Sequence, residues 1–126
     1  MVTMRGIRGA TTVSQDEKGM IAEATRELLG RMMEENDLDE EALISVIFTS
    51  TPDLHAGFPA AAAREMGLIQ TPLLSAQEVD VSGALPRCVR VLMLVETPRR
   101  KTEIRHVYLH EAVQLRPDWA GKDEQK

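Results

Sequence analysis

The feature that most constrains this chain is an apolar run from Val89 to Val95 that contains one charged residue, Arg90. The other six residues are Val, Leu and Met, and turn signals flank the run, which is typical of a strand buried on both faces. A guanidinium group keeps its proton inside a protein, so a buried Arg90 needs an anion beside it. Two partners remain open, a structural carboxylate such as Glu78 and the carboxylate of a ligand.

Hydrophobic periodicity predicts two helices and five strands. The first helix, residues 16–35, carries an apolar stripe at helical spacing, and Ser14 to Glu17 matches a capping box before it. A short second helix, Ala60–Met66, has Pro59 at its first turn and Gly67 as its C-cap. The predicted strands are Val2–Val13, Leu43–Thr49, Pro72–Ser75, Arg87–Thr97 and Ile104–Leu109.

Two of these strands contain residues that predict particular contacts. Gly6 and Gly9 in the first strand predict close approach by another element or a ligand. Tyr108 in the last strand shares its face with His106 and His110, so it has polar neighbours. The pattern shows no repeats or second domain, which predicts one domain over residues 1–117 and a flexible tail over residues 118–126.

Charge and composition argue against several partners. The formal net charge of −5 opposes binding to nucleic acids or anionic membranes, and eleven arginines against four lysines are spread along the chain. No stretch of 18 apolar residues is present. Cys88 is the only cysteine, which excludes an internal disulfide, favours a reducing cytoplasm and predicts a buried, inert thiol.

Motifs for metal, phosphate or nucleophilic chemistry are missing from the sequence. The three histidines and one cysteine have no recognised ligand spacing, and no glycine-rich phosphate loop or nucleophile elbow occurs. What remains is a group of arginines near element ends, with the hydroxyls of Ser75 and Tyr108 and the carboxylate of Glu78. Such a group can bind a small polyanion by charge-assisted hydrogen bonds. The arginines are Arg8, Arg64, Arg90, Arg105 and Arg116.

Four motifs in order make the chain, from about residue 4 to 118, resemble the monofunctional α/β-type chorismate mutases. They are MRGIRGATTV, TPDLHAGFPAAAARE, QEVDVSGALPRCVRV and IRHVYLHEAVQLRPD. The resemblance implies an α+β subunit in which two helices pack on one side of a five-stranded mixed sheet. It also implies a homotrimeric pseudo-barrel with active sites between subunits, and a Claisen rearrangement of chorismate to prephenate that needs no metal, cofactor or covalent intermediate.

Among the residues that the resemblance assigns, two are catalytic. Arg90 matches the arginine that contacts a substrate carboxylate and the ether oxygen of the breaking bond, and Glu78 matches the acceptor for the ring hydroxyl. A fixed cation at an oxygen that gains negative charge stabilises the transition state more than the ground state.

The other matching residues are assigned to substrate binding. The resemblance assigns the substrate carboxylates to Arg8 and Tyr108 and an apolar wall to Phe58 and Leu74. It places Ser75 near the ring hydroxyl, and Arg64 and Arg116 at the cleft mouth.

Two departures from the family pattern affect these assignments. Ala61 stands where a lysine is common, which removes one positive charge at the cleft mouth and predicts weaker substrate capture. Ser75 stands where a cysteine is common and keeps a small hydrogen-bonding side chain. Three alternatives stay open: an imine deaminase of similar subunit shape, a non-catalytic metabolite-binding trimer, and a purely structural pair of Arg90 with Glu78.

Overall fold

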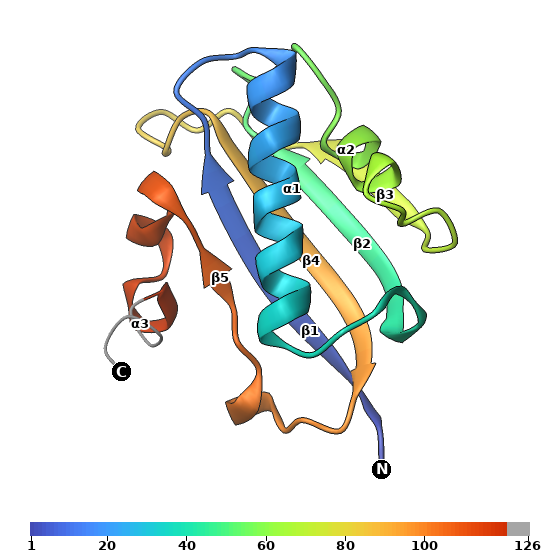
Figure 1. Ribbon diagram of the computed structural model, residues 1–126. Helices are drawn as coiled ribbons and strands as arrows, with labels where there is room; N and C mark the ends of the chain where they lie inside the picture. Colours follow the sequence, from blue (N-terminus) through green and yellow to red (C-terminus); the bar gives the residue numbers. More distant parts are fainter. Residues whose placement is uncertain (121–126) are drawn as a thin grey trace.

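The computed structural model describes residues 1–120, and in it five strands form one mixed sheet in the order β3-β2-β4-β1-β5. The central strand β4 runs antiparallel to β1 and β2, whereas β3 is parallel to β2 and β5 is parallel to β1. Helices α1 and α2 lie on one side of the sheet (Figure 1), which confirms the predicted layer arrangement. The strands are β1 (Thr3–Thr12), β2 (Leu43–Ser50), β3 (Leu73–Gln77), β4 (Cys88–Thr97) and β5 (Val107–Tyr108).

The two predicted helices are present with ends within two residues of the prediction, whereas the short α3 and the 3-10 turns were not predicted. The helical segments comprise α1 (Lys18–Glu35), α2 (Pro59–Glu65), a four-residue α3 (Pro117–Ala120) and 3-10 turns at Glu40–Ala42, Lys101–Glu103 and His110–Leu115. Pro59 begins α2 and Gly67 follows it with a φ of 109°, as predicted. The predicted flexible tail begins inside α3, and its residues 121–126 lie outside the described part of the chain.

The predicted capping box before α1 is wrong. The helix begins at Lys18, and its N-cap is Glu17, whose side chain accepts a hydrogen bond from the backbone N–H of Gly19. Asp16 is used elsewhere, because its carboxylate accepts hydrogen bonds from the backbone N–H groups of His55 and Ala56. A contact between residues so far apart in sequence leaves no local pattern.

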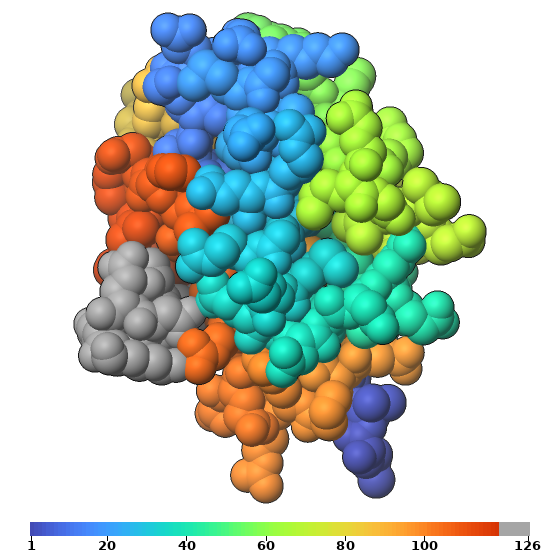
Figure 2. Space-filling model, viewed as in Figure 1, coloured from blue at the N-terminus to red at the C-terminus, as the bar shows by residue number. Residues whose placement is uncertain are grey.

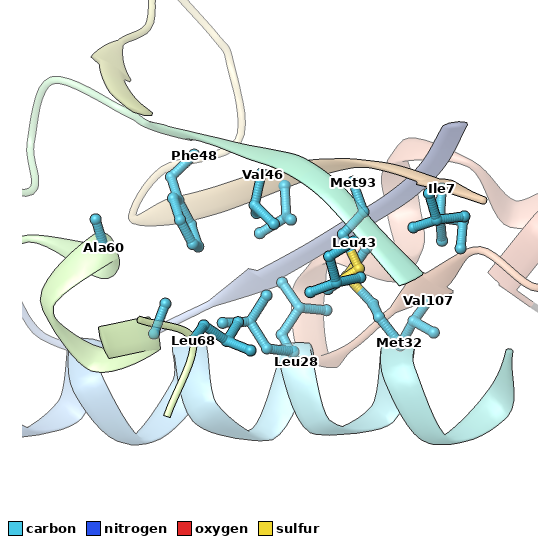
Figure 3. Close-up of a cluster of buried hydrophobic side chains, with 14 of the residues drawn as sticks. Ile7, Leu28, Met32, Leu43, Val46, Phe48, Ala60, Leu68, Met93 and Val107 are labelled. Atoms are coloured by element: carbon cyan, nitrogen blue, oxygen red, sulfur yellow. The ribbon is translucent and has the colours of Figure 1, made fainter. Parts of the chain in front are cut away.

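The core lies between the sheet and α1. The side chains of Val46, Phe48 and Met93 point from the sheet toward Leu28 and Met32 of α1 (Figure 3), and all five are fully buried. In Figure 2, which shows the same side as Figure 1, the side chains of α1 and α2 cover the sheet. This apolar contact fixes which face of each strand is inside.

Gly9 is the position where the helix approaches the sheet closely. A Cβ atom there would collide with the side chains of Met32 and Leu28, which confirms the predicted close approach by another element. At Gly6 no other element of the described chain approaches closely, since a Cβ atom would make only an ordinary 3.6 Å contact with Leu92.

Strand β4 is not buried on both faces within one chain. Val89, Val91 and Met93 face the helices and are fully buried, while Arg90 and Leu92 alternate with them and stay partly exposed. The prediction of burial on both faces is therefore wrong for a single chain. The face that carries Arg90 is not covered by α1 or α2, and this face positions the candidate site.

Strand β5 is shorter than predicted, because a side chain replaces the sheet partner at its start. The amide of Asn36 accepts a hydrogen bond from the backbone N–H of Arg105 and donates one to its carbonyl, both at 2.9 Å. His106 Nδ1 accepts from the N–H of Arg8 at 2.9 Å. Only Val107 and Tyr108 pair with β1, and they point to opposite faces, as the alternation predicts.

Candidate active site

Arg90 and Glu78 meet on the uncovered face of the sheet. Arg90 Nε lies 3.1 Å from Glu78 Oε2, and the two side chains are 30% and 18% exposed. The pair is an ion contact without a hydrogen bond, because Arg90 Nε is buried and forms no hydrogen bond with any described residue. The structural carboxylate left open by the sequence is thus present, but it engages the guanidinium through Nε. Neither terminal nitrogen of Arg90 donates a hydrogen bond to a residue of the described range 1–120.

Arg8 and Tyr108 lie on the same face as Arg90. Ala10 of β1 pairs with Arg90 on one side and with Tyr108 on the other, and Arg8 is two residues before Ala10 on the same face. Burial raises the pKa of the Tyr108 phenol, although the nearby guanidinium groups of Arg8, Arg116 and Arg90 act in the opposite direction. Tyr108 therefore keeps its proton at neutral pH and can donate a hydrogen bond to an anion.

The remaining predicted binding residues lie elsewhere in the chain. Phe58 and Leu74 are 74% and 63% exposed, and Arg64 is exposed on α2. Ser75 pairs with Phe48, so its side chain points to the helix side of the sheet, away from the Arg90 face. With Phe58 it lines a hollow of about 520 Å³. Leu74 differs, because it pairs with Ile47 opposite Leu92 and so lies on the Arg90 face, with β2 between its strand and β4.

Arg116 lies close to the end of the described chain and near Tyr108. Its guanidinium forms two hydrogen bonds with Asp118, at 3.1 and 2.9 Å, and these raise its pKa further. It is also close enough to Tyr108 to affect the phenol. The structure therefore places Arg116 near Tyr108, as it does Arg8 and Arg90.

Thr49 and Asp16 belong to the region of the site but were missed by the sequence analysis. Thr49 donates a 2.6 Å hydrogen bond to Glu78 Oε2. Asp16 holds the segment before Phe58 through the N–H groups of His55 and Ala56, and its Oδ2 lies 2.9 Å from His55 Nδ1. Threonine in a strand and aspartate before a helix are ordinary, so no local signal distinguished them.

The Asp16 contacts give a prediction about pH. The backbone N–H of Ala56 contributes most to the lowered pKa of Asp16, and contacts with His55 add to it. A carboxyl whose pKa falls on folding stabilises the protein above its unfolded pKa, and this contribution disappears as the pH falls through the folded pKa. Wild type should be more stable than Asp16→Asn in urea unfolding at pH 7, and the difference should shrink below about pH 4. An equal difference in unfolding free energy at pH 7 and pH 2.5 would contradict this origin. Asp80→Asn, at an exposed position, is the control.

Other chemistry has little support in the described residues. Cys88 is buried, as predicted, and burial raises the pKa of its thiol to about 11, which disfavours the nucleophilic thiolate. Within residues 1–120, no group of three or more His, Cys, Asp or Glu side chains is arranged to hold a metal ion. The described helices include none that is both long enough and apolar enough to cross a bilayer.

Comparison with known proteins supplies a family. The family model described as chorismate mutase type I matches residues 4–119. The chain is 55% identical over 116 residues to chorismate mutase AroH of Thermus thermophilus, covering 91% of this chain and 95% of that one. It is 47% identical over 116 residues to chorismate mutase AroH of Bacillus subtilis (strain 168), with 91% of each covered. A solved chorismate mutase from Clostridium thermocellum superposes with a TM-score of 0.85 at 50% identity, covering 86% of this chain and 96% of that one.

Proposed function

The chain belongs to the chorismate mutase type I family and is a chorismate mutase, and from this premise we propose that Arg90 is its principal catalytic group. The reaction converts chorismate to prephenate in one unimolecular step, in which an ether C–O bond breaks while a C–C bond forms. Membership of this family also favours isomerase chemistry over the imine deaminase and non-catalytic alternatives.

The observation that carries the proposal is the arrangement of Arg90. Its guanidinium lies nearest to Glu78 at Nε, and neither terminal nitrogen donates a hydrogen bond to a described residue, so both can donate to the substrate. Electron density moves onto the ether oxygen as the C–O bond breaks, so a fixed cation there acts more strongly in the transition state than in the ground state. Arg90 can therefore lower the barrier without transferring a proton.

The neighbouring groups fit the binding of a dicarboxylate with a ring hydroxyl. We assign the substrate carboxylates to Arg8 and to the protonated Tyr108, and the ring hydroxyl to the carboxylate of Glu78. These contacts hold the reacting ends of the molecule close together, an orienting contribution. No step requires a metal or cofactor.

In a homotrimer with active sites between subunits, a neighbouring chain would complete the site that Arg90, Glu78, Arg8 and Tyr108 form in part. Ser75 faces away from Arg90, and Phe58 and Arg64 belong to α2 and its N-cap on the helix side of the sheet. The large exposure of Phe58 and Leu74 suits contacts made by a neighbour. The exposed apolar side chains of Met4, Val79 and Val81 also suit burial between copies. We propose that the neighbouring subunit supplies this second group. Ala61 leaves Arg64 as the cation of α2, so substrate capture depends on Arg64.

The enzymatic activity has a direct test. Purified protein, dialysed against a chelator, is incubated with chorismate while chorismate absorbance and prephenate formation are followed. We expect conversion to prephenate without added metal or cofactor. Binding of chorismate without conversion would instead support a metabolite-binding trimer. We place this activity in the cytoplasm, in agreement with one buried, unpaired cysteine.

Shared sites predict recovery of activity in mixed trimers. Arg90→Ala and Arg64→Ala each remove one half of every site, so each variant alone should be nearly inactive. Unfolding and refolding a 1:1 mixture should restore about a quarter of the wild-type activity, because head-to-tail contacts in a ring pair the two intact halves at that frequency. Each variant refolded alone is the control. A trimer without recovered activity would contradict a site shared between subunits.

A further inference from the structure

Thr49 holds the catalytic carboxylate from the neighbouring strand. Thr49 of β2 lies directly across from Arg90 of β4 in the sheet register. Its hydroxyl donates a 2.6 Å hydrogen bond to Glu78 Oε2, the same oxygen that lies 3.1 Å from Arg90 Nε. The backbone carbonyl of the next residue, Ser50, accepts a hydrogen bond from the backbone N–H of Glu78 at 2.9 Å. Two successive residues of β2 therefore hold the backbone and the side chain of Glu78.

This contact gives the two carboxylate oxygens of Glu78 different environments. Oε2 contacts the Thr49 hydroxyl and Arg90 Nε, whereas no described residue donates a hydrogen bond to Oε1. A hydrogen bond from a hydroxyl to a carboxylate is among the stronger ones. Threonine is also stiff at χ1, which fixes the direction of the donor. Oε1 is thus the acceptor left for a ligand hydroxyl.

The hydroxyl of Thr49 also affects what Arg90 can bind. A carboxylate and a guanidinium prefer a bidentate pair that uses two parallel N–H donors. With Oε2 held by Thr49, Glu78 lies nearest to Arg90 at Nε, and no hydrogen bond joins Glu78 to a terminal nitrogen of Arg90. Without that hydroxyl, Glu78 could turn into a bidentate pair and occupy a terminal nitrogen of Arg90.

We propose that Thr49 is a positioning residue for the chorismate rearrangement, an inference that rests on the proposed roles of Glu78 and Arg90. Thr49 orients Glu78 so that Oε1 accepts the hydrogen bond of the ring hydroxyl and Arg90 stays available to the ether oxygen. It acts through these two side chains and touches no reacting atom.

Thr49→Val tests the proposal, because valine keeps the shape of threonine and removes the hydroxyl. We expect kcat to fall about tenfold with a smaller change in KM, the size expected for losing one hydrogen bond to a charged group. Thr49→Ser restores the hydroxyl and should stay within about threefold of wild type. Ser45→Ala removes a hydroxyl from the same strand face, opposite Leu94, and should leave turnover unchanged. Thr49→Ala is a second variant without the hydroxyl, in case valine prevents folding.

A double-mutant cycle separates positioning from a structural role. If Thr49 acts through Glu78, then Thr49→Val should lower kcat by less than about twofold in a Glu78→Ala background. Equal losses in both backgrounds, or full kcat in folded Thr49→Val and Thr49→Ala, would overturn the inference while wild type still converts chorismate. An inactive wild type would refute the proposed function itself.

Discussion

Arg90→Ala is expected to lower the kcat of chorismate rearrangement more than about a hundredfold, since losing one donor to a developing oxyanion costs about 3 kcal/mol or more. The guanidinium is the group that the proposal places beside the ether oxygen, where negative charge grows as the bond breaks. The variant also leaves Glu78, whose side chain is only 18% exposed, without its cation. Both effects act in the same direction, so this substitution has the largest expected effect on turnover.

Turnover of Arg90→Ala is measured from the loss of chorismate absorbance, with thermal unfolding as a check on folding. Arg31→Ala is the matched control, because Arg31 is a half-exposed arginine of α1 that pairs with Glu35 on the helix side of the sheet. It should keep wild-type turnover. If folded Arg90→Ala kept more than about a tenth of the wild-type kcat, Arg90 would not be the principal catalytic group.

Asn36→Ala is expected to have the largest effect on stability, lowering the free energy of unfolding by about 3 kcal/mol. Asn36 is 1% exposed, and its side chain forms four hydrogen bonds at the end of α1. It donates to the carbonyls of Met32 and Arg105, at 2.8 and 2.9 Å, and accepts from the N–H of Arg105 and from Arg99 Nη1, at 2.9 and 3.3 Å. Its loss leaves buried backbone groups unpaired where the chain enters β5.

Urea unfolding followed by circular dichroism measures this loss. Asn36→Leu is the informative companion, because its branched side chain leaves no cavity while removing all four hydrogen bonds. Both variants should be destabilised to a similar extent if the hydrogen bonds matter more than the cavity. A loss below about 1 kcal/mol in both would contradict this account of β5.

Local patterns in the sequence predicted most of the fold, and two of the failures, at the start of α1 and in β5, share one physical origin. Strand alternation and the Pro59 and Gly67 signals act over a few residues, and the structure agrees with them. The capping box failed because Asp16 binds a segment about 40 residues away. Strand β5 is short because Asn36, 69 residues before Arg105, takes its hydrogen bonds. Such long-range contacts have no periodicity to read.

The candidate site shows the same division. An arginine in an apolar run was visible in the sequence, and the structure supplies the Glu78 contact that the sequence could only offer as one option. The sequence could not show that Nε is the nearest nitrogen of Arg90 to Glu78, nor that Thr49 donates a hydrogen bond to this carboxylate. The separation of Ser75 and Phe58 from Arg90 depends on strand order and side-chain direction, which require the folded sheet.

Substitution of Arg90 by citrulline isolates the charge, because citrulline is nearly isosteric, neutral and still able to donate hydrogen bonds. Chorismate affinity and single-turnover rate are measured on the same protein. We expect binding to weaken by no more than about tenfold and the rate to fall more than about a hundredfold, since charge at the ether oxygen acts mainly in the transition state. A citrulline variant that converts bound chorismate at close to the wild-type rate would contradict electrostatic catalysis by Arg90.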